Sequence, residues 1–188
     1  MTEKPAGSRG DPFWRKPWIR GLSTSLVLLI MAGLFVFSHQ GQWESEKSSA
    51  PLARVIVNTG VAQSQTIKQV IEPVIHTDEE LPVEQQAQQI ARKLGHILIY
   101  GALGFWLLIC LKSWLDGRKG LPFWALLIGV LYGASDEWHQ SFVPARSAEG
   151  HDVMVDAIGV ALGVLLAVYA VKGMEKRRIR KKAPSGTR

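Results

Sequence analysis

The sequence predicts an all-α integral membrane protein with four transmembrane helices, cytoplasmic N- and C-termini, and a long external loop between the first two helices. Four apolar blocks indicate this fold class, since each is close to the roughly 17 to 25 residues that a helix needs to cross a bilayer. The positions of Lys and Arg indicate the orientation, because these residues flank the blocks on one side. The lipid bilayer is therefore the first expected partner.

The external loop, residues 38–92, is expected to contain short amphipathic helices, because Val and Ile recur at helical spacing within it. Its last part, 83–92, is expected to continue as helix into the second span. Spans are predicted at 19–37, 93–112, 121–143 and 152–171. The other segments are a basic cytoplasmic N-terminus at 1–18, a cytoplasmic loop at 113–120, an external loop at 144–151 and a basic cytoplasmic tail at 172–188.

The net charge of +6 does not indicate a nucleic-acid partner, because the basic residues are not interleaved with aromatic residues on one polar face. Of the 22 Lys and Arg residues, five lie in 1–20, three in 112–121 and eight in 172–188. Cytoplasmic segments of membrane proteins are enriched in Lys and Arg. Both termini and the middle loop are therefore predicted to lie inside, which requires an even number of spans.

Charged side chains are unusually dense between residues 133 and 163, within two apolar blocks. An ionised side chain in hydrocarbon is costly unless it is paired or hydrated, so such residues are by default a hypothesis about function. The ionisable residues of this stretch are Asp136, Glu137, His139, Arg146, Glu149, His151, Asp152 and Asp156. All of them fall in the outer halves of the predicted spans or in the external loop.

The second span offers partners for these charges. Arg92, His96 and Tyr100 recur every four residues and so share one helix face, with Lys93 beside them. We therefore predict a polar pocket that opens outward between the second, third and fourth spans. Its expected residues are Arg92, Lys93, His96, Tyr100, Ser135, Asp136, Glu137, His139, Gln140, Arg146, Asp152 and Asp156. Gly159 and Gly163, four residues apart, are expected to allow close helix packing.

Other interpretations of the polar residues remain open. They could form a structural network that only holds the helices together. An enzyme acting on a lipid or envelope precursor, with Glu137 or His139 as acid or base, is also open. The histidines and acids show no H-E-x-x-H spacing, so no metal is predicted. Transport would require a larger assembly, and dimerisation through Gly159 and Gly163 would give a homo-oligomer.

Three stretches together resemble the VanZ-like family of bacterial membrane proteins. They are RKLGHILIY at 92–100, YGASDEWHQSFVPAR at 132–146 and DVMVDAIG at 152–159, and the FSHQ exit from the first span is similar too. The resemblance covers residues 19–171. It implies a multi-pass protein of a bacterial cytoplasmic membrane, without a cofactor, in a family whose founding member is associated with low-level resistance to teicoplanin-type glycopeptides. The family's signature polar residues correspond to Lys93, His96, Tyr100, Ser135, Glu137, Gln140, Arg146, Asp152 and Gly159.

The predicted function is therefore that of a non-enzymatic protein of the cell envelope. Its outward pocket is expected to bind a lipid-linked cell-wall component or a lipoglycopeptide at the outer leaflet, and to confer low-level teicoplanin-type resistance. This hypothesis depends on polar groups that lie on one side of the membrane.

Overall fold

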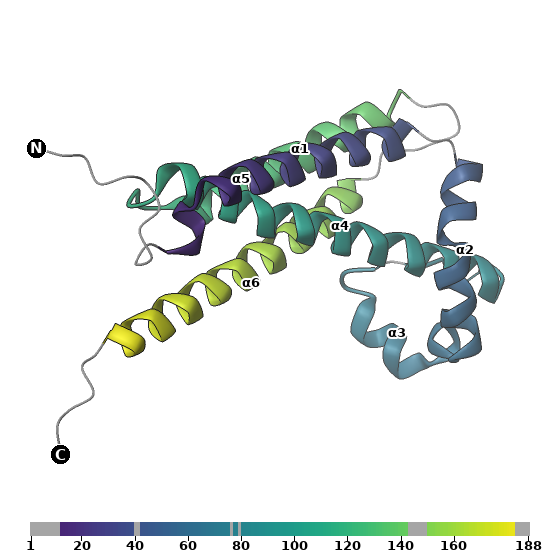
Figure 1. The fold of residues 1–188 in the computed structure, drawn as a ribbon. Helices are drawn as coiled ribbons and strands as arrows, with labels where there is room; N and C mark the ends of the chain where they lie inside the picture. Colours follow the sequence, from purple (N-terminus) through teal and green to yellow (C-terminus); the bar gives the residue numbers. More distant parts are fainter. Residues whose placement is uncertain (1–11, 40–41, 76, 79, 143–149, 183–188) are drawn as a thin grey trace, which may run out of the picture.

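The computed structural model describes residues 12–39, 42–75, 77–78, 80–142 and 150–182 (Figure 1). All regular elements in these ranges are helices, which confirms the all-α class. The elements are η1 (Phe13–Arg15), α1 (Pro17–His39), α2 (Gln42–Asn58), η2 (Val61–Gln63), α3 (Gln65–Ile71), α4 (Val83–Leu115), α5 (Leu121–Gln140) and α6 (Gly150–Lys182).

Three helices of the described ranges are long and apolar enough to cross a membrane. They contain the segments Pro17–Val36, Val83–Leu115 and Asp152–Arg180. Helix α5 is not among them, because its last turns carry the polar run from Ser135 to Gln140. The protein is therefore a multi-pass membrane protein, and the fourth span and the topology stay predictions.

Helix α4 is the centre of the fold and packs against α1, α2, α5 and α6. It begins at Val83, which confirms that the end of the predicted external loop continues as helix into the span. Its 33 residues correspond to about 50 Å, well beyond the hydrocarbon thickness of about 30 Å. Part of this helix must therefore project out of the bilayer.

Two apolar cores lie along α4. The larger core joins α4 to α1, α5 and α6 around Tyr100, Leu103, Ala125 and Val160. The smaller core joins the N-terminal part of α4 to α2 and η2, and α2 crosses this end of the helix (Figure 1). Its buried members are Ala53, Ile56, Ala62, Ile75, Ala87, Ile90 and Ala91. The predicted amphipathic helices are thus present, and their external location stays a prediction.

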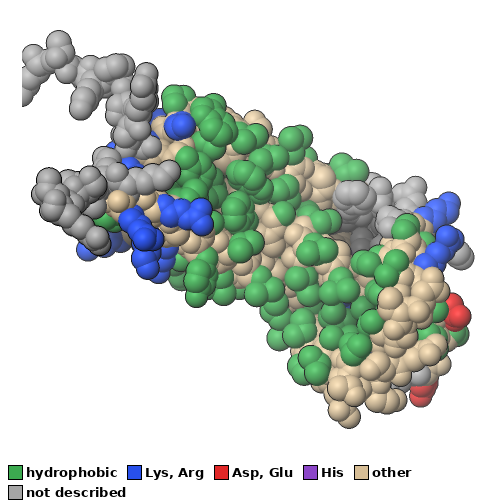
Figure 2. All heavy atoms as spheres, turned by 60° about the horizontal axis from the view of Figure 1, so that its bottom comes forward, with side chains coloured by type: hydrophobic (Ala, Val, Ile, Leu, Met, Phe, Trp, Pro, Cys, Tyr) green, Lys and Arg blue, Asp and Glu red, His purple; other side chains and the backbone are tan. Residues whose placement is uncertain are grey.

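The outer surface of the bundle is apolar. Leu29, Leu131 and Leu166, from three different helices, are each at least 60% exposed. Figure 2 shows hydrophobic side chains spread over this face, between a group of Lys and Arg at one end and the α2–α3 unit at the other. Side chains of this kind lose nothing by facing lipid, whereas they are costly in water. The surface therefore matches a bilayer as its surroundings.

Helices α4 and α6 approach each other at glycines. A Cβ atom on Gly163 would lie 1.9 Å from the carbonyl oxygen of Gly101, and one on Gly104 would lie 2.4 Å from that of Val160. A Cβ on Gly159 would lie 2.7 Å from the carbonyl oxygen of Ile97. Gly159 and Gly163 thus pack against α4 of the same chain. The surface through which dimerisation was considered as an alternative is thus covered by α4.

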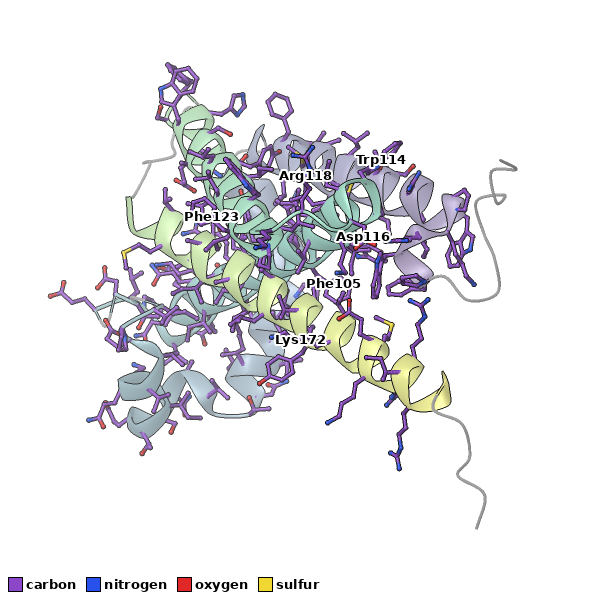
Figure 3. The ribbon with its side chains drawn as sticks, turned by 90° about the vertical axis from the view of Figure 1, so that its left-hand side faces the viewer. Phe105, Trp114, Asp116, Arg118, Phe123 and Lys172 are labelled. Atoms are coloured by element: carbon purple, nitrogen blue, oxygen red, sulfur yellow. The ribbon has the colours of Figure 1, made fainter. Side chains whose placement is uncertain are left out.

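Ion pairs join the helices at the basic end of the bundle. Arg15 Nε lies 2.5 Å from Asp116 Oδ2, and Lys112 Nζ lies 3.7 Å from Asp116 Oδ1 and 3.4 Å from Glu175 Oε1. The Lys112 ammonium also lies 4.6 Å from the centre of the Trp14 ring. Figure 3 views the molecule from this end, with Asp116 beside α1. The start of α1 and the ends of α4 and α6 therefore lie together.

Candidate functional site

Eight polar side chains come together at the opposite end of the bundle, and we call them the polar cluster. Most of those on one helix are three or four residues apart and so lie on one side of it, whereas Glu137 follows Asp136 directly and is rotated by about 100° from it. The members of the polar cluster are Lys93, His96 and Tyr100 on α4, Asp136, Glu137 and Gln140 on α5, and Asp152 and Asp156 on α6. All eight belong to the predicted pocket.

Two basic groups of α4 face the two acids of α6. His96 Nδ1 lies 3.0 Å from Asp156 Oδ1, and Asp156 is fully buried. One turn closer to the helix end, Lys93 Nζ lies 3.7 Å from Asp152 Oδ1. A buried carboxylate is stable only with a partner of this kind, so each pair fixes the register of α6 on α4.

Asp136 is held by neutral donors. The Tyr100 hydroxyl and the Gln140 side-chain amide each donate to Asp136 Oδ2, at 3.1 Å in both cases. Gly133 packs against both Asp156 and Tyr100: a Cβ there would lie 3.3 Å from Asp156 Cβ, slightly closer than ordinary contact, and 3.5 Å from the Tyr100 ring. Gly133 is therefore a packing residue of the cluster that the sequence analysis missed.

Glu137 differs from the other acids. It is only 4% exposed, and neither of its carboxylate oxygens accepts a hydrogen bond from any residue that the structure describes. Asp152, Asp156 and His96 are close enough for their charges to act on it. The second oxygen of Asp156, Oδ2, is also buried without a hydrogen-bond donor. The polar cluster thus holds acceptor atoms that its described residues leave unused.

Three residues of the predicted pocket do not join the cluster. Ser135 is exposed and donates to the Tyr132 carbonyl oxygen of its own helix, at 2.7 Å. The His139 ring packs on Phe35 of α1, with 4.7 Å between ring centres, so His139 does not stand beside Glu137. Arg92 is half-buried and forms no ion pair with a described residue, whereas the adjacent Lys93 does.

The side chains of two further residues lie outside the part of the chain that the structure describes. Arg146 lies outside the described residues, and of His151 only the backbone is described, in the first turn of α6. Among the side chains that are described, no group of three or more His, Cys, Asp or Glu residues could hold a metal ion.

A family model described as VanZ/LLP1 matches residues 24–171. The match covers the bundle and every residue of the polar cluster. No curated protein and no solved structure matches the chain.

Proposed function

The chain belongs to the VanZ/LLP1 family of membrane proteins, and from this premise we propose that its polar cluster is an outward-facing binding site. The proposed ligand is a lipid-linked cell-wall component or a glycopeptide antibiotic at the outer leaflet of a bacterial cytoplasmic membrane. Binding there would give low-level resistance of the teicoplanin type.

Glu137 is the observation that carries this proposal. A network that only joined helices would leave no carboxylate oxygen unused, because a buried acceptor without a donor destabilises the fold. Both oxygens of Glu137 are in that situation among the described residues. A site that gives up stability in this way is typical of binding, where the ligand completes the hydrogen bonds.

The proposed orientation of the polar cluster in the membrane depends on the uneven distribution of Lys and Arg along the bundle. The ends of α4 and α6 that carry Lys112 and Glu175 adjoin the basic tail, and the positive-inside rule puts that end in the cytoplasm. Helix α5 lies beside α1, α4 and α6. If α5 is the fourth span, the polar cluster opens to the outside.

The proposal predicts that Glu137→Gln abolishes protection against teicoplanin in a susceptible bacterial host, while the protein still inserts into the membrane. The matched control is Glu175→Gln, which removes a carboxylate at the basic end and should protect as the wild type does. Full protection by a normally expressed Glu137→Gln variant would show that the polar cluster is not the binding site responsible for protection.

An enzyme acting on an envelope lipid is the second candidate, because unpaired carboxylate oxygens are also what a general base needs. In that case Glu137 would act without His139, whose ring packs on α1. Turnover of labelled envelope lipids by the purified protein, lost in Glu137→Gln, would favour this candidate over simple binding.

A further inference from the structure

We propose that the group bound by the polar cluster is a primary ammonium, carried by an amphiphilic molecule. This inference rests on the proposed binding function and specifies the chemistry of its ligand. It depends on the charges, the unused acceptor atoms and the surroundings of Glu137.

Negative charge exceeds positive charge on the side of the cluster that faces α6. Glu137, Asp152 and Asp156 stand there against Lys93 and His96. Even with His96 protonated, one carboxylate has no cation among these groups. Glu137 is that carboxylate, since Lys93 pairs with Asp152 and His96 with Asp156. A ligand that completes this site should therefore bring one positive charge.

The unused atoms are all acceptors. Both Glu137 oxygens and Asp156 Oδ2 are buried without a hydrogen-bond donor among the described residues. An ammonium offers three N–H donors and no acceptor, so it satisfies such atoms without adding a new unmet group. A phosphate would add further acceptors and negative charge. A quaternary ammonium carries charge but no donor, and proteins bind it with aromatic rings instead.

The surroundings favour an amphiphile over a free amine. The cluster reaches the surface at His96 and Asp152, whose side chains are 24% and 20% exposed. Beside it, Trp138, Phe142 and Met154 are each more than half exposed. Apolar side chains next to a charged opening at the membrane surface suit a molecule with an ammonium head and an apolar body.

The test measures binding of dodecylamine, dodecyltrimethylammonium and dodecanol to the full chain in detergent micelles at neutral pH. Dodecylamine should bind at least about tenfold more tightly than the other two, because hydrogen bonds to a charged group contribute that much. Glu137→Gln should remove this preference, and Glu175→Gln should retain it. Equal binding of the amine and either control, or a preference that survives Glu137→Gln, would overturn the inference.

Two sources could supply the ammonium, and a second set of probes separates them. One arm compares a lipid-linked precursor whose stem-peptide lysine is free with the same precursor acetylated at that lysine. The other arm compares a teicoplanin-type glycopeptide with its N-acetyl derivative. In the arm that carries the natural ligand, acetylation should weaken binding about tenfold or more.

The outcomes also separate this inference from the proposed function. If dodecylamine binds at Glu137 but neither envelope ligand does, the ammonium site stands and the proposed function fails. If an envelope ligand binds through Glu137 whether or not it is acetylated, the proposed function stands and the ammonium assignment is wrong. Thermal unfolding of each variant, measured in the same micelles, shows that lost binding is not lost folding.

Discussion

The replacement Gly163→Ala tests the crossing of α4 and α6, on which the geometry of the polar cluster depends. The added Cβ would lie 1.9 Å from the carbonyl oxygen of Gly101 and 2.9 Å from the backbone nitrogen of Phe105. Both neighbours are backbone atoms in a helix, so neither can rotate away. Ordinary contact begins near 3.4 Å, and the two helices would therefore have to separate by about 1.5 Å.

The cost of this separation follows from packing. A gap of only about 0.5 to 1 Å already removes a quarter to a half of the dispersion attraction across a contact. Overpacked sites typically cost 1 to 3 kcal/mol, and with rigid backbone on both sides we expect about 3 kcal/mol here. The assay is thermal and denaturant unfolding of the purified protein in detergent micelles.

Gly173→Ala is the matched control on the same helix. Nothing lies within 4 Å of a Cβ at Gly173, so this replacement adds no clash. Helix propensity alone predicts that it stabilises the protein by up to about 1 kcal/mol. The two variants should thus move in opposite directions. A Gly163→Ala protein as stable as the wild type would show that the helices do not cross at these glycines.

Three further predictions concern single side chains. Tyr100→Phe should destabilise the protein by about 1 to 3 kcal/mol, because it removes a buried donor to Asp136, whereas Tyr169→Phe, at a 78% exposed position, should change nothing in the same unfolding assay. Glu137→Gln should raise the unfolding temperature, because it removes a buried charge that lacks a hydrogen-bond donor, and a lower temperature than that of the wild type would contradict this. Burial raises the pKa of Asp116, but the hydrogen bond from Arg15 and the charges of Arg15 and Lys112 outweigh it and lower that pKa. The ionised Asp116 carboxylate therefore stabilises the fold above its unfolded pKa of about 4, and this stabilisation is lost as the pH falls below that value. Asp116→Asn should accordingly lower the free energy of unfolding by up to about 1 kcal/mol at pH 7 and leave it unchanged in strong acid.

Helical periodicity predicted much of the polar cluster. The spacing of His96 and Tyr100 put them on one face of the second span, and the structure gives each an acid as partner. The same argument put Arg92 on this face and Lys93 only beside it, whereas Lys93 is the residue that joins the polar cluster. The crossing of α4 and α6 decides this, since it brings Asp152 to Lys93.

Contacts between distant helices account for what the sequence analysis missed. His139 was expected in the same pocket as Asp136, but its ring packs on Phe35 of α1. Gly159 and Gly163 were expected to allow close helix packing, but the sequence analysis did not identify α4 as the helix they pack against. Gly101 and Gly104, three residues apart in an apolar span, were the available signal for that surface.

The segment predicted as an external loop, residues 38–92, contains longer helix than its sequence indicated. Helix α2 runs for 17 residues and continues through Pro51, which sequence rules treat as a helix breaker. Pro51 is exposed, while Ala53 and Ile56 on the same helix are buried in the smaller core. Tertiary packing against α4 therefore outweighs the local preference of proline, and such packing cannot be read from a local pattern.

The central claim is that the polar cluster opens to the outer side of the membrane, and cysteine labelling tests it most directly. In a Cys110→Ser background, Ser141→Cys puts a thiol on an exposed residue next to the cluster, and Lys119→Cys puts one on an exposed residue at the basic end. A thiol reagent that does not cross membranes should label the cysteine at 141 in intact cells, and the cysteine at 119 only after the cells are permeabilised. Labelling of position 119 alone in intact cells would contradict an outward-facing site.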